Sequence, residues 1–157
     1  MSDDRIVDNG LEPPELVVRV EAVVGRLLAP VGDREASISL TYADAAGMWF
    51  VDVTPGNSLA ASISVGIANN DNDFLVGVPN AHWEIWAGDA QGPPLAELER
   101  QLEAIVLGRI ETAGRGPDRP AVLRLTDGTT SRVGRARLPI PWRWRRRTSF
   151  DAYGGDS

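Results

Sequence analysis

The sequence predicts an α+β domain in which an antiparallel, meandering sheet is covered by two amphipathic helices and followed by a hairpin and a basic tail. Apolar residues recur at helical spacing in two separated stretches, 16–28 and 95–106, whereas residues between these stretches alternate with period two. The turns between the alternating stretches are short, which favours antiparallel pairing of neighbouring strands. With 157 residues, 43% of them hydrophobic, the chain suffices for one domain with its own core.

The first helix is expected after an acidic, flexible lead at residues 1–12. Pro13-Pro14-Glu15 begins it, because proline suits the first helical turn and a carboxylate there interacts favourably with the helix dipole. The apolar stripe then runs to Leu28, and Pro30 and Gly32 end the helix.

Five strands are expected between the two helices, since short alternating stretches there are separated by residues typical of turns. We place these strands at residues 37–42, 48–53, 59–67, 74–78 and 81–86. The second helix is expected at Leu95–Arg109, with glutamates in its first half and an arginine near its end.

A hairpin is expected after the second helix, because Asp127-Gly128 separates two strand-like stretches, Ala121–Leu125 and Ser131–Arg137. We therefore assign residues 1–138 to a single α+β domain. Residues 139–157 are assigned to a tryptophan- and arginine-bearing tail that is partly disordered, above all at its end, Tyr153–Ser157.

Charge is divided unevenly along the chain. Residues 1–111 contain 18 acidic residues and six arginines, a net charge of −12, whereas residues 112–157 contain ten arginines and four acidic residues, a net charge of +6. An acidic body of this kind indicates binding to a basic partner and disfavours nucleic acid as a ligand, because like charges repel.

Several classes of chemistry are excluded by composition. The chain has no cysteine and no lysine, and His82 is its one histidine. With a single histidine we expect neither a catalytic triad nor a three-histidine zinc site, and zinc thiolate sites and Schiff-base lysines are excluded outright. The polar run Asn69–Asp73 departs from a calcium-binding loop, since Phe74 stands where that loop needs glycine. We expect no enzyme activity, no metal and no cofactor.

The acidic N-terminus is not typical of a secretory signal, and no apolar run approaches the ~20 residues that span a bilayer. We therefore expect a cytoplasmic protein that does not bind membranes. The sequence leaves open whether it is a monomer or a homodimer.

The predicted partner-binding surface lies around the fourth and fifth strands. Trp83 and Trp86 differ in strand parity, so both cannot face the core, and an exposed tryptophan is a good interface anchor. Carboxylates near them can act as phosphate mimics toward a basic partner. The predicted contact residues are Asp71, Asp73, Trp83, Glu84, Trp86 and Asp89.

The C-terminal basic run offers an alternative site with three interpretations. It is an edge strand with tryptophans inward, a nucleic-acid contact in which arginines meet phosphates and tryptophans stack on bases, or a segment that contacts an acidic surface of this chain or a partner. The residues of this tail site are Trp142, Arg143, Trp144, Arg145, Arg146 and Arg147.

Residues 36–110 resemble immunity proteins of actinobacterial polymorphic-toxin systems. The resemblance is carried by the hairpin through Gly47–Val51, the polar turn Asn69–Asp73, the strand bearing His82-Trp83-Glu84, and the helix Leu95–Arg109. It implies a non-enzymatic inhibitor that neutralises a basic, nuclease-like toxin through an acidic surface.

The order of elements is also similar to that of small acidic type III secretion chaperones. These proteins dimerise and bind an unfolded stretch of a secreted partner. That similarity implies an adaptor as the alternative function, and a nucleic-acid adaptor acting through the tail is the further alternative.

Overall fold

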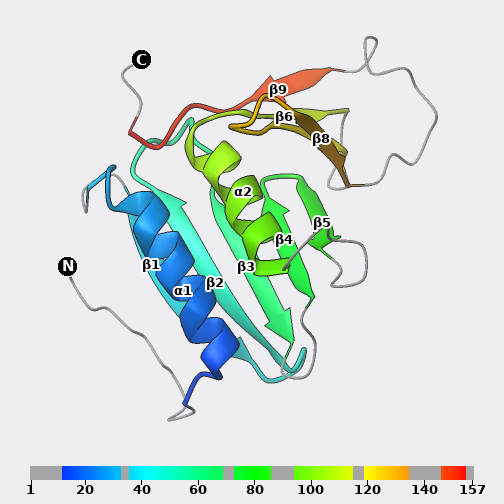
Figure 1. Ribbon diagram of the computed structural model, residues 1–157. Helices are drawn as coiled ribbons and strands as arrows, with labels where there is room; N and C mark the ends of the chain where they lie inside the picture. Colours follow the sequence, from blue (N-terminus) through cyan, green and yellow to red (C-terminus); the bar gives the residue numbers. More distant parts are fainter. Residues whose placement is uncertain are drawn as a thin grey trace.

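Two helices and two antiparallel sheets make up the computed structural model (Figure 1), which describes residues 12–32, 36–68, 73–85, 94–114, 119–134 and 146–154. The predicted α+β class is confirmed. The elements in chain order are α1 (Glu15–Leu28), β1 (Ala36–Ala43), β2 (Met48–Pro55), β3 (Ile63–Ala68), β4 (Phe74–Val78), β5 (Ala81–Ile85), α2 (Pro94–Val106), β6 (Ile110–Ala113), β7 (Ala121–Arg124), β8 (Thr130–Val133) and β9 (Arg147–Ser149).

The first sheet is a simple meander of five strands in the order β1-β2-β3-β4-β5, with every neighbouring pair antiparallel. Short turns produce this order, as the sequence predicts. Gly47, in the turn between β1 and β2, has a φ of 61°, and Asn80, between β4 and β5, has a φ of 64°. Glycine and asparagine are the residues that adopt this left-handed conformation most readily.

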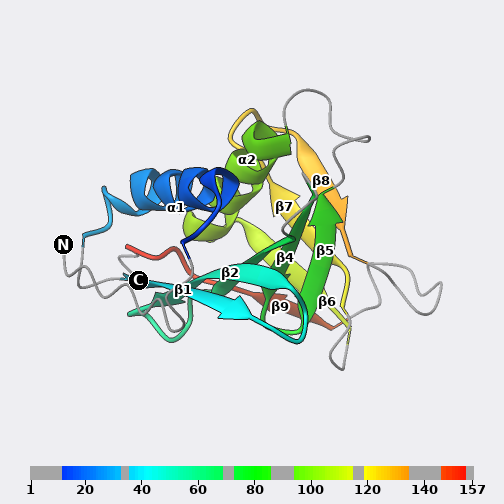
Figure 2. The same cartoon turned by 90° about the horizontal axis from the view of Figure 1, so that it is seen from below.

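Both helices pack on the same face of this sheet (Figure 2), which we call the covered face. The apolar stripe of α1 is buried through Val17, Val20 and Val24, and that of α2 through Leu98, Leu102 and Ile105. Alternate side chains of the strands complete the core beneath them: Leu40, Trp49, Val51, Val53, Ile63, Val65, Ile67, Phe74, Val76, Val78, Ala81, Trp83 and Ile85.

The second sheet has four strands in the order β8-β7-β6-β9 and contacts α2 through β7. The predicted hairpin is confirmed: β7 pairs antiparallel with β8, and Gly128 between them has a φ of 86°. Strand β6 was not predicted from the sequence; it follows α2 closely, after Gly108, which has a φ of 69°. A strand this short has too few residues to show a clear alternation.

The C-terminal segment, residues 146–154, belongs to the folded body. Strand β9 pairs with β6, and Asp151 forms a parallel bridge with Ala60 beside β3. Tyr153 has no exposed surface, its backbone N–H donates to the Val106 carbonyl at 2.9 Å, and its hydroxyl donates to the Ala61 carbonyl. Our prediction that the chain is disordered from Tyr153 onward is therefore wrong at Tyr153, because this side chain fills space between α2 and β3.

Candidate functional site

One face of the five-stranded sheet carries no helix or strand among the residues that the structure describes, and we call it the open face (Figures 1 and 2). Its side chains are those at the strand positions that alternate with the core. Their register places Ser39, Asp52, Ser64, Gly77 and His82 in one row across the sheet. The adjacent row is Thr41, Phe50, Gly66, Leu75 and Glu84.

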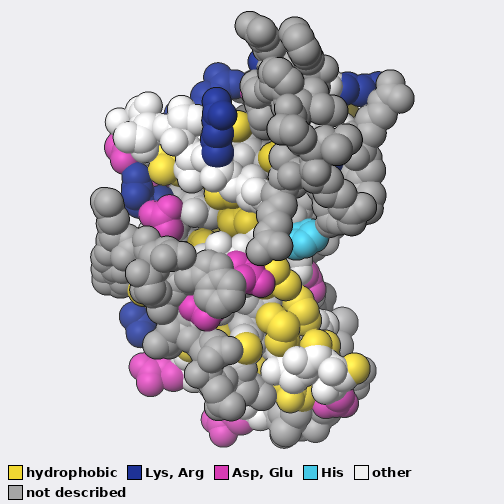
Figure 3. Space-filling view, turned by 90° about the vertical axis from the view of Figure 1, so that its right-hand side faces the viewer, with side chains coloured by type: hydrophobic (Ala, Val, Ile, Leu, Met, Phe, Trp, Pro, Cys, Tyr) yellow, Lys and Arg dark blue, Asp and Glu magenta, His cyan; other side chains and the backbone are white. Residues whose placement is uncertain are grey.

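The two rows differ in chemistry. Phe50 and Leu75, with Met48 at the end of β2, are half-buried and form an apolar strip on the open face. A Cβ atom at Gly66 would lie 2.8 Å from Cε of Met48 and 3.0 Å from Cε1 of Phe50, so these side chains close over the glycine. Figure 3, which views the molecule from the right-hand side of Figure 1, shows hydrophobic side chains exposed in its lower half.

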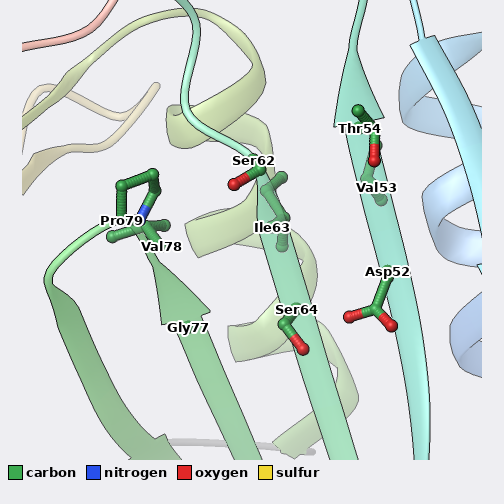
Figure 4. Close-up of a pocket in the computed structure, with 9 residues that line it drawn as sticks. All are labelled: Asp52, Val53, Thr54, Ser62, Ile63, Ser64, Gly77, Val78 and Pro79. Atoms are coloured by element: carbon green, nitrogen blue, oxygen red, sulfur yellow. The ribbon is translucent and has the colours of Figure 1, made fainter.

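The polar row borders a depression of about 370 Å³ that opens to solvent (Figure 4). Figure 4 looks onto the open face with the helices behind it, and the side chains of Asp52, Ser62 and Ser64 lie on the near side of the sheet. The backbone at Gly77 and the ring of Pro79 bound the depression on the β4 side. We call this feature the polar depression; its lining residues are Asp52, Val53, Thr54, Ser62, Ile63, Ser64, Gly77, Val78 and Pro79.

Gly77 keeps the depression open. A Cβ atom there would meet only Ser64, at 3.7 Å from its Cβ, which is ordinary contact. Glycine inside a strand often marks a place where a ligand or another chain approaches the backbone closely. The polar depression therefore exists because β4 has no side chain at the position facing Ser64.

Charge on the open face has a single sign. No arginine or lysine occurs anywhere between Arg34 and Arg100, so the sheet itself carries no basic side chain except His82. Its described carboxylates on this face are Asp52 and Glu84, with Asp73 immediately before β4. The face is accordingly acidic.

The second sheet carries the opposite charge. Arg124 and Arg132 are exposed on its hairpin, and Arg146 and Arg147 are exposed at β9. Arginine side chains accordingly gather in the upper part of Figure 3, over this sheet. The division of charge along the chain has thus become a division in space.

Four acidic residues outside the open face lie close to arginines. Nη2 of Arg26 lies 3.2 Å from Oε1 of Glu99, Arg100 contacts Glu97 and Asp127, and Nη2 of Arg124 lies 3.8 Å from Oε2 of Glu111. Two hydrogen bonds from Thr129 are the main reason that the pKa of Asp127 is lowered. By contrast, no ion pair links Asp52 or Glu84 to an arginine among the described residues, and their charge remains available to a partner.

The structure separates the predicted contact residues. Glu84 is exposed on the open face, and Asp73 lies half-buried at the same end of β4. Trp83 points the other way: it is 5% exposed, and its indole Nε1 donates to Oε1 of Gln101 on α2 at 2.7 Å. Trp83 is thus a core residue rather than the interface anchor that we predicted, because strand alternation turns it toward the helices. Asp71, Trp86 and Asp89 lie outside the described residues.

The alternative tail site is described only at its end. Arg146 and Arg147 are exposed, and the Arg146 carbonyl accepts a hydrogen bond from the Gly114 N–H at 2.7 Å. An edge strand begins at the end of this run and comprises Arg147–Ser149. The interpretation of the tail as an edge strand with tryptophans inward concerns other residues and stays a prediction. Trp142, Arg143, Trp144 and Arg145 lie outside the described residues.

The residues of the polar depression and of the apolar strip were not predicted as a site from the sequence. Two signals point to them: Ser64-Val65-Gly66 and Leu75-Val76-Gly77 place glycines inside predicted strands, where a glycine commonly indicates close approach of other atoms. Asp52 alternates with the core residues Val51 and Val53, which assigns it to the outer face once the core side is known.

Within the described ranges, no group of three or more histidine and acidic residues is arranged to hold a metal ion. No helix found there is long and apolar enough to cross a membrane. Comparison of the chain with protein-family models, curated proteins and solved structures finds no match.

Proposed function

We propose that this chain is a non-enzymatic protein-binding domain of the immunity type, which neutralises a basic, nuclease-like toxin in the cytoplasm. The observation that carries the proposal is the acidic open face: a five-stranded sheet without a single arginine, whose carboxylates Asp52 and Glu84 have no described cationic partner. A nuclease presents a basic active site to phosphates, and protein carboxylates can occupy the same positions.

The shape of the open face agrees with this proposal. The half-buried Met48, Phe50 and Leu75 supply apolar area, while Glu84 lies on the edge strand β5 and Asp73 directly precedes β4. Protein interfaces are commonly arranged in this way, with an apolar core and a polar rim. The second sheet is basic and repels a basic protein, whereas the acidic open face attracts it. Long-range attraction of this kind orients the two proteins as they meet.

The proposed contact set is revised accordingly. Asp73 and Glu84 are retained, Asp52 is added, and Trp83 is removed because it is buried. Asp71, Trp86 and Asp89 remain predictions.

The test is inhibition of a purified nuclease toxin domain encoded next to this chain. We expect the Asp52→Arg/Glu84→Arg variant to weaken inhibition by at least about a hundredfold, since two charge reversals at one interface cost several kcal/mol. Glu103→Arg is the matched control for reversal of a single charge, because Glu103 lies on α2, on the opposite side of the sheet. This variant should inhibit the toxin as the wild type does. Equal inhibition by the wild type and the double variant would refute the open face as the binding surface.

A secretion chaperone is the second candidate, because the apolar strip of Met48, Phe50 and Leu75 suits an extended apolar segment of a secreted protein. Chaperones of that class are dimers. Light scattering coupled to size-exclusion chromatography distinguishes the two functions: a strict monomer argues against the chaperone.

A further inference from the structure

We propose that the polar depression is a binding site for the guanidinium group of an arginine side chain. This inference rests on the proposed function, in which the open face meets a basic protein, and it identifies the side chain that the face recognises. The depression lies within that face and joins one carboxylate, three hydroxyl groups and a glycine backbone.

The polar groups match the donors of guanidinium. Arginine presents five N–H donors in a planar fork, two of which suit a carboxylate in bidentate fashion. Asp52 supplies that carboxylate, and it is the cross-strand neighbour of Ser64. Thr54 and Ser62 lie one row farther along, so that their hydroxyl oxygens and that of Ser64 can accept the remaining donors.

The shape of the depression favours a flat group on a long stem. Gly77 leaves the β4 side without a side chain, and Pro79 next to it offers an apolar ring. A guanidinium can stack flat against such a surface while its methylene stem packs on proline. The ammonium group of lysine is a compact, strongly hydrated charge. It can pair with Asp52, but it has no planar group to stack against the surface at Gly77 and Pro79.

Charge excludes the opposite ligand class. Asp52 repels phosphates and carboxylates, and no arginine of the sheet offsets it. A metal ion is also disfavoured, because a single carboxylate with neutral hydroxyls is a poor ligand set for calcium or magnesium.

The experiment is a ¹⁵N-NMR titration of the full chain with the peptide acetyl-Gly-Gly-Arg-Gly-Gly-amide. We expect amide shifts concentrated at Ser64 and Gly77, saturating in the millimolar range, and at least about tenfold weaker binding of the otherwise identical lysine peptide. Equal affinity for the two peptides overturns the guanidinium assignment, and so do shifts confined to the C-terminal segment.

Two variants test the site itself. Gly77→Val projects a branched side chain into the depression from a Cβ position that is in ordinary contact with Ser64 alone, and Asp52→Asn removes the charge without adding bulk. Each is expected to weaken arginine-peptide binding at least about tenfold, whereas the control Asp44→Asn, in the exposed β1–β2 turn, leaves it unchanged. Unchanged binding in both variants overturns the proposal.

The two proposals fail separately. If Gly77→Val inhibits the toxin as well as the wild type does, the arginine site is refuted while the proposed function stands. If the chain binds the arginine peptide at Gly77 but inhibits no neighbouring toxin, the site stands and the proposed function is refuted.

Discussion

The indole Nε1 of Trp83 donates a hydrogen bond to Oε1 of Gln101 at 2.7 Å, and both side chains are buried. Nε2 of Gln101 in turn donates to Oε1 of Glu97 at 2.9 Å. The hydrogen bond between Trp83 and Gln101 joins the edge strand β5 to α2, and it lies on the side of β5 that faces the helix. His82 and Glu84, which alternate with Trp83, consequently face solvent.

Replacing Gln101 with leucine is expected to destabilise the fold by about 1–3 kcal/mol, because the indole N–H of Trp83 would remain buried without an acceptor. Urea unfolding followed by circular dichroism measures the change. The double variant Trp83→Phe/Gln101→Leu removes donor and acceptor together, so its loss should be smaller than the sum of the two single losses. Additive losses would show that the two side chains do not interact.

Tyr153→Phe is expected to cost about 1 kcal/mol near neutral pH, since the Ala61 carbonyl loses its hydroxyl donor. Burial raises the pKa of Tyr153 above its ordinary value of 10.0. The folded state therefore retains this proton after the unfolded state has lost it, and wild-type stability falls as the pH rises above 10.

Phenylalanine has no proton to lose at this position, so the stability difference between Tyr153→Phe and the wild type should shrink above pH 10. Urea titrations at pH 7 to 11 measure this difference. Tyr42→Phe, at a half-buried residue, is the matched control. A pH-independent difference for Tyr153→Phe would contradict the assigned burial.

Gly108→Ala is expected to lower the free energy of unfolding by about 2–4 kcal/mol, because a left-handed backbone conformation and a steric overlap would both disfavour alanine there. Gly108 has a φ of 69°, and a Cβ there would lie 2.5 Å from the backbone nitrogen of Ala152. Gly32 is the matched control: its φ is 84°, but nothing lies within 4 Å of a Cβ. Gly32→Ala should therefore cost only about 1 kcal/mol, and equal losses would argue against close packing of the C-terminal segment on Gly108.

Gly66→Ala and Gly77→Ala are expected to change stability in opposite directions. At Gly66 the new methyl group meets Met48, Phe50 and Leu75 at 2.8 to 3.3 Å, so a loss of about 1–2 kcal/mol is expected. At Gly77 the contact with Ser64 is ordinary, and the stiffer unfolded chain should stabilise the fold by about 0.5 kcal/mol. Thermal unfolding compares the two variants, and a marked loss at Gly77 would contradict an open depression there.

Local periodicity was sufficient to predict most of the fold. The stripe ending at Leu28 identifies α1, alternation around Leu40 and Val51 identifies strands, and Asp127-Gly128 identifies the hairpin. Each signal arises from residues close together in the chain, so it can be detected without knowing which strand or helix the element packs against. The pairing of β6 with β9 could not be predicted in this way, because Glu111 and Ser149 are 38 residues apart.

The candidate site was predicted only in part for a related reason. Alternation indicates that Trp83 and Glu84 point to opposite sides of β5, but it does not indicate which side the helices cover. Glu84 is exposed and its contact with a partner stays a prediction, whereas Trp83 is buried because α2 packs against it through Gln101. Asp52 and Gly77 are distant in the chain and share the polar depression only because β3 lies between them.

By itself, the sequence determined the kind and order of most elements and the uneven division of charge, because both are properties of neighbouring residues. Tertiary structure decided which sheet face is covered, where Tyr153 is anchored, and where the two charges lie. The five strands of the first sheet contain no arginine, whereas three of the four strands of the second sheet contain one each. Strand pairing across long separations, set by burial of apolar side chains against the helices, therefore converts a pattern along the chain into an acidic face.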